Sequence, residues 1–285
     1  MDLWFTEDYH DGWELSVRVN EVLVTETSPY QRIDILQTRD FGRMLVLDGK
    51  VQACELDEFI YHEMMAHVTL LTHPNPRRVL VAGGGDGGAM REVMRHPSVE
   101  RGVLVDIDER VIQLCNQFMP TLSEGLAREP RLVTAPADAA EYLRKARDLD
   151  VILVDSSDPV GPSEALFQMD FYRSLKNALA PGGMVCLQAG SPFFYRDQIV
   201  TMVRQLREVF PVVRLGIIPV PTYPSGNWCL AFASLETDPG SIDAGLLERR
   251  QRERGFTTRY YTPQMHHAAM VLPPFLSERL EPVPV

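Results

Sequence analysis

The sequence predicts an α/β fold in which a doubly wound, mostly parallel sheet follows a small antiparallel β domain. From residue 78 onwards, strand-like runs alternate with helix-like runs, which is the pattern of a parallel sheet built from βαβ units. Near-continuous apolar runs at 79–81 and 151–154 suit strands that are buried on both faces. Before residue 55, short runs rich in Val, Ile, Leu and Thr are instead separated by turn residues, as in antiparallel sheets.

The first domain is expected to cover residues 1–54. Turn residues at 28–29 and 40–42 separate its strand-like runs. Asp48 and Gly49 predict a hairpin over 47–51, because an Asp-Gly pair readily supplies the positive φ of a tight turn. The predicted strands of this domain are 13–19, 21–26, 32–37 and 43–47.

The second domain is expected to cover residues 55–285. A helix over 57–73 has apolar side chains at helical spacing and ends before Pro74. The last two strands have no helix between them, which predicts an antiparallel last strand. The predicted strands are 78–82, 102–107, 131–134, 150–155, 183–188, 212–220 and 228–234, and the further helices are 89–95, 109–118, 137–147, 167–179, 196–210, 241–254 and 274–279.

The charge balance disfavours nucleic acid as a partner. Lys and Arg total 28 and Asp and Glu total 39, so the formal net charge is −11. Nucleic-acid binding requires clustered cations, and the densest basic run, at 248–254, is interrupted by acids. This balance favours a cationic small molecule as the ligand.

Other features indicate a cytoplasmic protein without a metal site. No apolar stretch approaches the roughly 20 residues of a membrane span, and the N-terminus lacks the pattern of a signal peptide. Cys54, Cys115, Cys186 and Cys229 are scattered and never form C-x-x-C, so they are expected to be buried thiols in a reducing compartment. The histidines do not cluster with them.

A glycine-rich loop at 83–88 follows a predicted strand and opens a helix, and it contains G-x-G-x-x-G. Asp106 lies 23 residues after Gly83 at the end of the next strand, where an acid commonly accepts hydrogen bonds from ribose. Asp86 would repel a pyrophosphate but attract a sulfonium, so the loop suits an S-adenosyl sulfonium better than NAD. The alternatives are a plain turn with a helix-capping acid, and an Asp86 that points to solvent.

Several carboxylates follow the predicted parallel strands, whose carboxyl ends line the ligand crevice in such sheets. Their convergence would be costly unless cations occupy the crevice. Any single one of them could instead cap a helix or form a turn, and a turn before the following proline is a serious alternative for Asp158. The five are Asp86, Asp106, Asp138, Asp155 and Asp158.

With these motifs the chain resembles the spermidine synthase family of polyamine aminopropyltransferases. The most specific combination is Gly-Gly-Gly-Asp-Gly-Gly at 83–88 with Asp-Ser-Ser-Asp-Pro-Val-Gly-Pro at 155–162. Matching segments extend over nearly the whole length, and the others are 4–7, 28–31, 41–42, 47–49, 57–64, 73–76, 91–93 and 221–226.

The resemblance implies a methyltransferase-like Rossmann domain behind the β domain, and a homodimer or homotetramer. It implies transfer of an aminopropyl group from decarboxylated S-adenosylmethionine to a diamine, commonly putrescine. The products would be spermidine and 5′-methylthioadenosine. Decarboxylated S-adenosylmethionine would be a co-substrate, with no metal and no cofactor.

The resemblance also implies roles for individual residues. Asp155 would be the proton acceptor, and Tyr61 would act with it by orienting the diamine. Asp158 would hold the diamine with His62 nearby, and Asp86 would lie at the amine of the aminopropyl group. The remaining substrate-binding residues would be Gln31, Asp106, Asp138 and Ala139 at the nucleoside, Pro162 near the adenine, and Gln52, Tyr223 and Trp4 along the pocket wall.

The sequence departs from the family pattern at three places. Asp106 stands where the family usually has Glu, Cys54 replaces a more typical Thr, and Ala189–Gly190 lacks an acid that some members have. Cadaverine or a longer polyamine therefore stays open as the acceptor. An S-adenosylmethionine-dependent methyltransferase and a non-catalytic polyamine-binding paralogue are the rival functions, and Asp86 makes a dehydrogenase the weakest alternative.

Overall fold

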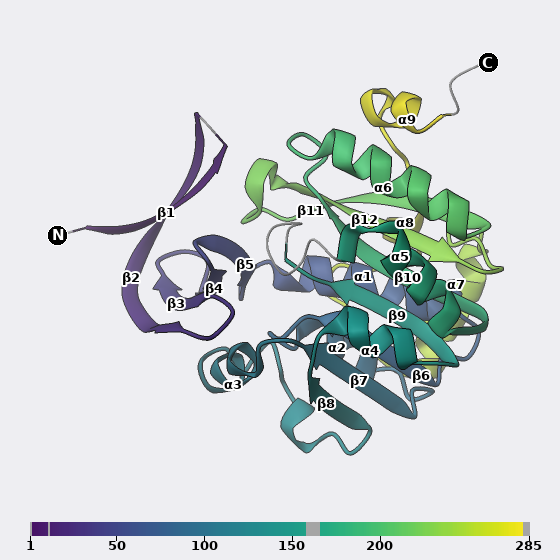
Figure 1. Cartoon of the computed structure of the whole chain (residues 1–285), viewed down its shortest axis with the longest axis horizontal. Coiled ribbons are helices and arrows are strands. Elements are labelled where there is room, and N and C mark those ends of the chain that lie inside the picture. The colour runs from purple at the N-terminus through teal and green to yellow at the C-terminus, as the bar shows by residue number, and fades with distance from the viewer. Residues whose placement is uncertain (1, 11, 158–165, 282–285) are drawn as a thin grey trace.

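A computed structural model of the chain describes residues 2–10, 12–157 and 166–281. The described residues form two sheets, and Figure 1 shows the smaller one standing at the side of the larger α/β body. This agrees with the predicted fold class: a small antiparallel β unit precedes a mostly parallel α/β sheet.

The first sheet has five strands in sequential, antiparallel order. The predicted strands 13–19 and 21–26 are one strand, with the register shifting between Val19 and Glu21, and the first strand was not predicted. The predicted Asp48–Gly49 turn is confirmed, with φ of 46° and 77°. The strands are β1 (Leu3–His10), β2 (Trp13–Thr27), β3 (Arg32–Thr38), β4 (Arg43–Leu47) and β5 (Lys50–Cys54).

The second sheet has seven strands in the order β11-β12-β10-β9-β6-β7-β8. β12 is antiparallel to both of its neighbours, while the pairs from β10 to β8 are parallel, which confirms the predicted antiparallel last strand. The strands are β6 (Arg78–Gly83), β7 (Arg101–Asp106), β8 (Leu132–Pro136), β9 (Leu149–Asp155), β10 (Leu179–Gly190), β11 (Val212–Pro219) and β12 (Asn227–Ser234).

Helices cover both faces of this sheet, which explains its apolar strands. Ile152 of β9 belongs to a buried cluster with the helices α4 to α6, whereas the next residue, Leu153, belongs to a second cluster with α1, α2 and α7. The helices are α1 (Glu58–Thr72), α2 (Gly88–Met94), α3 (Glu109–Phe118), α4 (Ala139–Lys145), α5 (Met169–Ala178), α6 (Arg196–Val209), α7 (Ala244–Arg254), α8 (Pro263–Ala268) and α9 (Pro274–Leu280).

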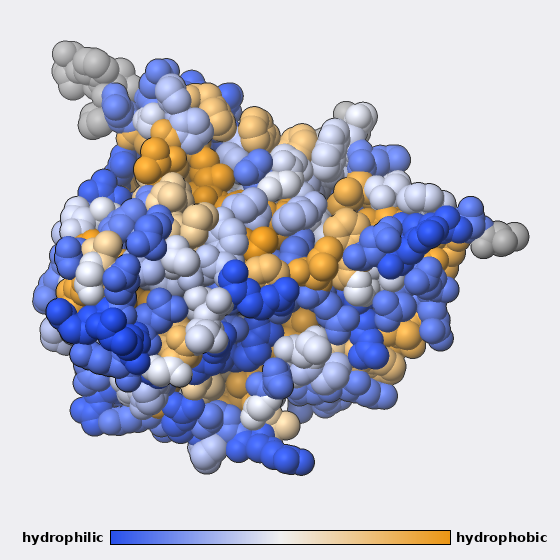
Figure 2. All heavy atoms as spheres, turned by 180° about the vertical axis from the view of Figure 1, so that it is seen from behind, coloured by the Kyte–Doolittle hydropathy of each residue, from blue (hydrophilic) through white to orange (hydrophobic). Residues whose placement is uncertain are grey.

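The helix predicted over 241–254 begins only at Ala244, because the Asp243 side chain caps it by accepting from Leu246 N at 2.9 Å. The short helix α8 was not predicted. Within the described ranges, no helix is long and apolar enough to cross a bilayer. On the face opposite to that of Figure 1, hydrophilic residues cover much of the surface, with hydrophobic residues in separate patches between them (Figure 2).

The helix α3 joins the two sheets. Its buried Leu114 and Cys115 belong to one apolar cluster with Ile33 and Ile35 of β3. At the edge of this contact, Arg110 pairs with Glu26 through two bonds of 2.6 and 2.8 Å. The small sheet is thereby packed beside the carboxyl ends of the large one, where β7 leads into α3.

Candidate functional site

The strands β6 and β9 are neighbours, and the chain leaves them towards opposite faces of the sheet. They pair in parallel up to Gly83 and Asp155. After β6 the chain forms α2, which packs in the cluster with α1, whereas the helix that follows β9 packs in the opposite cluster. Such a reversal opens a crevice at the carboxyl ends of the strands, the usual ligand site of these sheets.

Asp155 ends β9 and has one oxygen in a hydrogen bond. The Tyr61 hydroxyl, from the first turn of α1, donates to Asp155 Oδ1 at 2.8 Å. The other oxygen, Oδ2, is buried and has no hydrogen-bond partner among the described residues. Burial raises the pKa of Asp155 to about 6 and Asp86 adds to this effect, while His62 and the Tyr61 bond oppose it. Asp155 is therefore ionised at neutral pH and still able to accept a proton.

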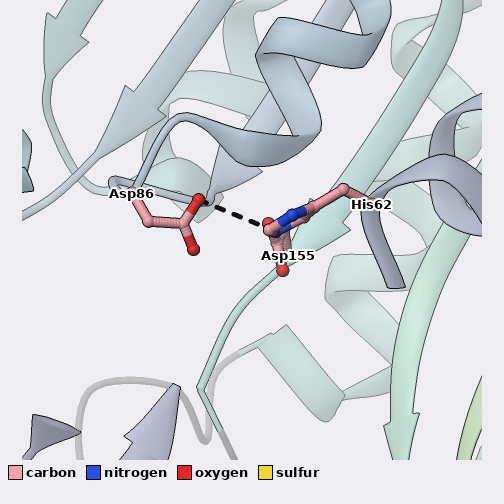
Figure 3. A group of neighbouring side chains, drawn as sticks. All are labelled: His62, Asp86 and Asp155. Atoms are coloured by element: carbon pink, nitrogen blue, oxygen red, sulfur yellow. Dashed lines mark ion pairs between the residues drawn. The ribbon is translucent and has the colours of Figure 1, made fainter. Parts of the chain in front are cut away.

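Three side chains from separate elements meet at this point. His62 comes from α1, Asp86 from the loop after β6 and Asp155 from β9, and each has a polar atom within 4.8 Å of the others. Figure 3 shows the Asp86 carboxylate facing the His62 ring, with Asp155 beside that ring. His62 Nε2 lies 3.7 Å from Asp86 Oδ1, and these two residues are only 2% and 8% exposed. The predicted convergence of Asp86 and Asp155 is thus present.

His62 is the cation of this group. Burial lowers its pKa, but Asp86, Glu58 and Asp155 outweigh burial and raise the pKa of His62 to about 9. An imidazolium has no lone pair for a metal, and binding as a ligand would require loss of its proton. The carboxylates around His62 thus favour its cationic form, and the three side chains form an ion cluster in this structure.

The glycine loop makes room for the acids. A Cβ at Gly84 would lie 2.8 Å from Asp155 Oδ2, and one at Gly85 would lie 2.7 Å from Asp106 Oδ2. Gly84 also has a φ of 69°, which side chains disfavour. The loop consequently passes between two carboxylates and brings its backbone close to the crevice.

Gln31 reaches the end of β7 from the small sheet. Its Nε2 donates to Asp108 Oδ2 at 3.0 Å, and the Ser28 hydroxyl donates to the same oxygen at 2.6 Å. Asp106 accepts from Asp108 N at 2.8 Å. Burial raises the pKa of Asp106 to about 6 against the opposing backbone bonds from Asp108 and Gly85. Asp108 was not predicted here, although an acid directly before the helix 109–118 is a typical N-cap.

Tyr223 lies next to Tyr61, with ring centroids 5.9 Å apart. Its hydroxyl donates to the backbone oxygen of Gln52, so two of the three residues predicted for the pocket wall lie on this side of Asp155. Asp57 fixes the loop that carries Tyr223: it accepts from Thr222 N at 2.8 Å and from the Thr222 hydroxyl at 2.7 Å.

Known families match the chain over most of its length. The model of the spermine/spermidine synthase domain matches residues 58–240, and that of the spermidine synthase tetramerisation domain matches residues 3–55. The chain belongs to the spermine/spermidine synthase family. This confirms the family expected from the sequence.

Curated relatives and solved structures agree with this assignment. The polyamine aminopropyltransferase of Thermoanaerobacter sp. (strain X514) is 42% identical over 99% of this chain and 100% of its own length. That of Desulforudis audaxviator (strain MP104C) is 44% identical over 98% and 99%. A spermidine synthase crystallised with the transition-state analogue AdoDATO has a TM-score of 0.93 at 37% identity, covering 98% of this chain and 94% of the other. The spermidine synthase of Thermotoga maritima has a TM-score of 0.91, also at 37% identity.

Not every residue expected from the family resemblance joins the Asp155 group. Trp4 lies on β1, the outer strand of the small sheet, and is 54% exposed. Asp138 is exposed and accepts from Ala140 N at 2.7 Å. In this structure it therefore caps the helix α4, which is the alternative role considered for it above. Ala139 begins α4 and is half-buried. Asp158 and Pro162 lie outside the described residues.

Two residues that support the family's acidic crevice were not predicted. Gln188 of β10 donates to Ser157 O at 3.2 Å and accepts from the indole of Trp228 at 3.2 Å, so it holds the chain just after Asp155. Glu58 accepts from His62 Nδ1 at 2.6 Å. The spacing of Glu58 and His62, four residues apart on a predicted helix, is a signal that could have identified this pair.

Proposed function

We propose that this chain transfers the aminopropyl group of decarboxylated S-adenosylmethionine to putrescine, giving spermidine and 5′-methylthioadenosine. The relatives named above are polyamine aminopropyltransferases, and a spermidine synthase at 37% identity binds a transition-state analogue. The observation that carries the proposal is Asp155, a half-buried residue whose carboxylate accepts from Tyr61 at one oxygen and has its other, buried oxygen free of described partners.

The acceptor amine must lose a proton to react. An alkyl amine titrates near ~10 and arrives as a cation at neutral pH. Asp155 takes this proton while the Tyr61 hydroxyl orients the nitrogen. A pKa of about 6 makes Asp155 a stronger base than an ordinary carboxylate and leaves it ionised at neutral pH.

The transfer itself is one displacement. The neutral nitrogen attacks the methylene carbon next to the sulfonium, a C–N bond forms, and the C–S bond breaks with its electron pair going to sulfur. The sulfonium leaves as neutral methylthioadenosine, and the proton stays with Asp155 until it passes to solvent. The buried His62 and Asp86 line this place, and desolvation of the bound amine would favour its neutral form.

The other site residues have binding roles in this proposal. Asp86 attracts the aminopropyl amine and disfavours the carboxylate of ordinary S-adenosylmethionine, because like charges repel. Asp158 holds the diamine, with His62 nearby. The nucleoside contacts are Gln31, Asp106, Asp138, Ala139 and Pro162, and the wall residues are Gln52, Tyr223 and Trp4.

Three further assignments belong to the same proposal. We assign the β domain to residues 1–54 and the catalytic domain to residues 55–285. The match of residues 3–55 to a tetramerisation domain supports a homotetramer, with a homodimer as the smaller alternative. The four cysteines are free and buried, which supports a reducing, cytoplasmic location.

The test is to incubate the full-length protein with each adenosyl donor and a panel of amines and to identify products by mass spectrometry. Methylthioadenosine with spermidine is the expected result. Formation of S-adenosylhomocysteine would instead indicate methyl transfer, and no product with any pair would indicate a binding protein. Faster turnover of cadaverine than of putrescine would correct the acceptor, which the absence of an acid at Ala189–Gly190 makes the specific point to check.

A further inference from the structure

A second layer of charge lies behind His62. Glu58, one helical turn earlier on α1, accepts from His62 Nδ1 at 2.6 Å, and its same oxygen accepts from Arg91 Nη2 of α2 at 2.9 Å. The Glu58 and His62 side chains are 6% and 3% exposed. Arg91 is also held by Thr121 O at 3.0 Å, so it cannot swing away from Glu58 without losing that bond.

The ring of His62 is also fixed by packing. A Cβ at Gly88, the first residue of α2, would lie 2.2 Å from His62 Nδ1 and Cε1. The ring therefore rests against the backbone of α2, which only a glycine permits. With Nδ1 bonded to Glu58, the remaining nitrogen, Nε2, must point towards Asp86, 3.7 Å away.

Each element packed against His62 brings a charged group close to its ring. Glu58 is on its own helix, Asp86 is in the loop before α2, and Asp155 ends β9. The only cation that the structure describes in this layer is Arg91, and it reaches Glu58 rather than the ring. The neighbouring Tyr61 ring meets His62 edge-on at 5.3 Å between centroids. Carboxylates thus surround a single imidazole.

We propose that Glu58, held by Arg91, is a positioning residue that keeps His62 cationic and aimed at Asp86 and Asp155. This inference rests on the proposed role of Asp155 as the proton acceptor. A cation at His62 favours the ionised form of Asp155, which is the form that can take a proton from the amine. Glu58 touches neither substrate in this scheme, and it acts on the reaction through His62.

The direction of the effect follows from the charges. In Glu58→Gln the ring loses the carboxylate that bonds its Nδ1, and the proposal requires the pKa of His62 to fall below that of Asp155, so that the ring is neutral on the acidic limb of the pH profile. Asp155 then loses a neighbouring cation, and its own pKa rises. The acidic limb of the pH profile of kcat/KM reports the ionisation of Asp155. We expect this limb to move to higher pH by about one unit, which lowers kcat/KM on the limb roughly tenfold.

Glu92→Gln is the matched control. Glu92 is also buried and also accepts from Arg91, at 2.9 Å, but its other partners are the buried His67 and the half-buried Arg95. Both variants therefore remove one buried carboxylate from the same arginine. Glu92→Gln is expected to lower the melting temperature and to leave the acidic limb where it is in the wild type.

A folded Glu58→Gln enzyme whose pH profile coincides with the wild-type profile would overturn the proposal, as would an equal shift in Glu92→Gln. If Glu58→Gln does not fold, ¹⁵N-histidine NMR of the wild-type protein at pH 7.5 decides instead: His62 with protons on both nitrogens is expected, and a neutral ring overturns the proposal. The Asp155→Asn enzyme separates this result from the proposed function. Full turnover in that variant would show that Asp155 is not the proton acceptor, whatever the result with Glu58→Gln.

Discussion

Two buried histidines, His62 in the crevice and His96 in the core, have opposite electrostatic surroundings. They are 2% and 0% exposed, so burial alone would lower the pKa of both. Carboxylates around His62 raise its pKa to about 9. No carboxylate is among the main groups that shift the pKa of His96. Burial, His67 and Arg254 lower this pKa well below the usual range. The charge of a buried histidine in this fold is therefore set by its neighbours.

The two groups also differ in how completely their hydrogen bonds are made. In the core, Arg254 donates to His96 Nδ1 at 3.0 Å, His96 and His67 share a 2.9 Å bond, and His67 reaches Glu92 at 3.0 Å. In the crevice, Asp155 Oδ2 has no partner among the residues that the structure describes. A closed chain of bonds stabilises the core, whereas the crevice leaves Asp155 Oδ2 unbonded, as the proposed proton transfer requires.

The largest expected effect is that of Asp155→Asn. The amide cannot accept the amine proton, so kcat is expected to fall by about 10²–10⁴-fold. Affinity for the adenosyl donor, measured by calorimetry, is expected to change far less, because Tyr61 and the glycine loop keep their places. Comparable losses in turnover and donor affinity would contradict the proton-acceptor role.

The second prediction concerns stability against pH, and its sign differs between the two histidines. The pKa of His62 is raised, so its contribution is fully present below pH 6.5 and lost as the pH rises through about 9. The pKa of His96 is lowered, so its contribution is present above pH 6.5 and lost as the pH falls, when the unfolded chain takes up the proton. The alkaline loss from His62 is about 3 kcal/mol.

The measurement is chemical denaturation of the wild type, His62→Gln and His96→Gln between pH 5 and pH 10. His62→Gln is expected to flatten the alkaline side of the stability curve, and His96→Gln the acidic side. The same pH dependence in both variants would mean that the contrast between crevice and core is wrong.

Gly88→Ala tests how tightly the His62 ring is packed. The new methyl would meet the ring, and overpacking of this kind costs about 1–3 kcal/mol. Gly245→Ala in α7 is the control, because the nearest atom to its Cβ is Asp243 Oδ1 at 3.2 Å and a helix favours alanine. Thermal melts should show a clear loss for Gly88→Ala and little loss for Gly245→Ala, and equal melts would count against a fixed ring.

The smallest expected effect is that of Asp106→Glu, which restores the residue usual in the family. In the proposed site the longer side chain would reach one methylene further towards the ribose, so the affinity for the donor should change by the free energy of about one hydrogen bond, or roughly fivefold. Because Asp106 is not in the His62 group, kcat should stay constant. A large change in kcat would link the nucleoside end to the reacting end.

The fold class was predictable from the sequence, because the periodicity of apolar residues and the residues of tight turns can both be recognised within short stretches of the chain. The alternation after residue 78 and the Asp48–Gly49 turn are both present in the structure. The unpredicted strand Leu3–His10 carries mixed polar and aromatic residues, and its pairing with β2 rather than its own pattern makes it a strand.

The site was predictable as far as motifs mark strand ends. Asp86 and Asp155 were expected to meet, and they do, around His62. The support from Glu58 and Arg91 depends on how α1 packs against α2, which sequence spacing within one helix only partly encodes. Which carboxylate remains free and which one is capped, as Asp138 is, likewise depends on tertiary contacts.

The most direct test of the contrast between crevice and core is ¹⁵N-histidine NMR of the wild-type protein, with His62 and His96 titrated in one sample. At pH 7.5 we expect His62 to carry protons on both ring nitrogens, with a midpoint near pH 9, while His96 carries one proton and stays neutral. Two neutral rings at that pH, or a charged His96 beside a neutral His62, would contradict the account.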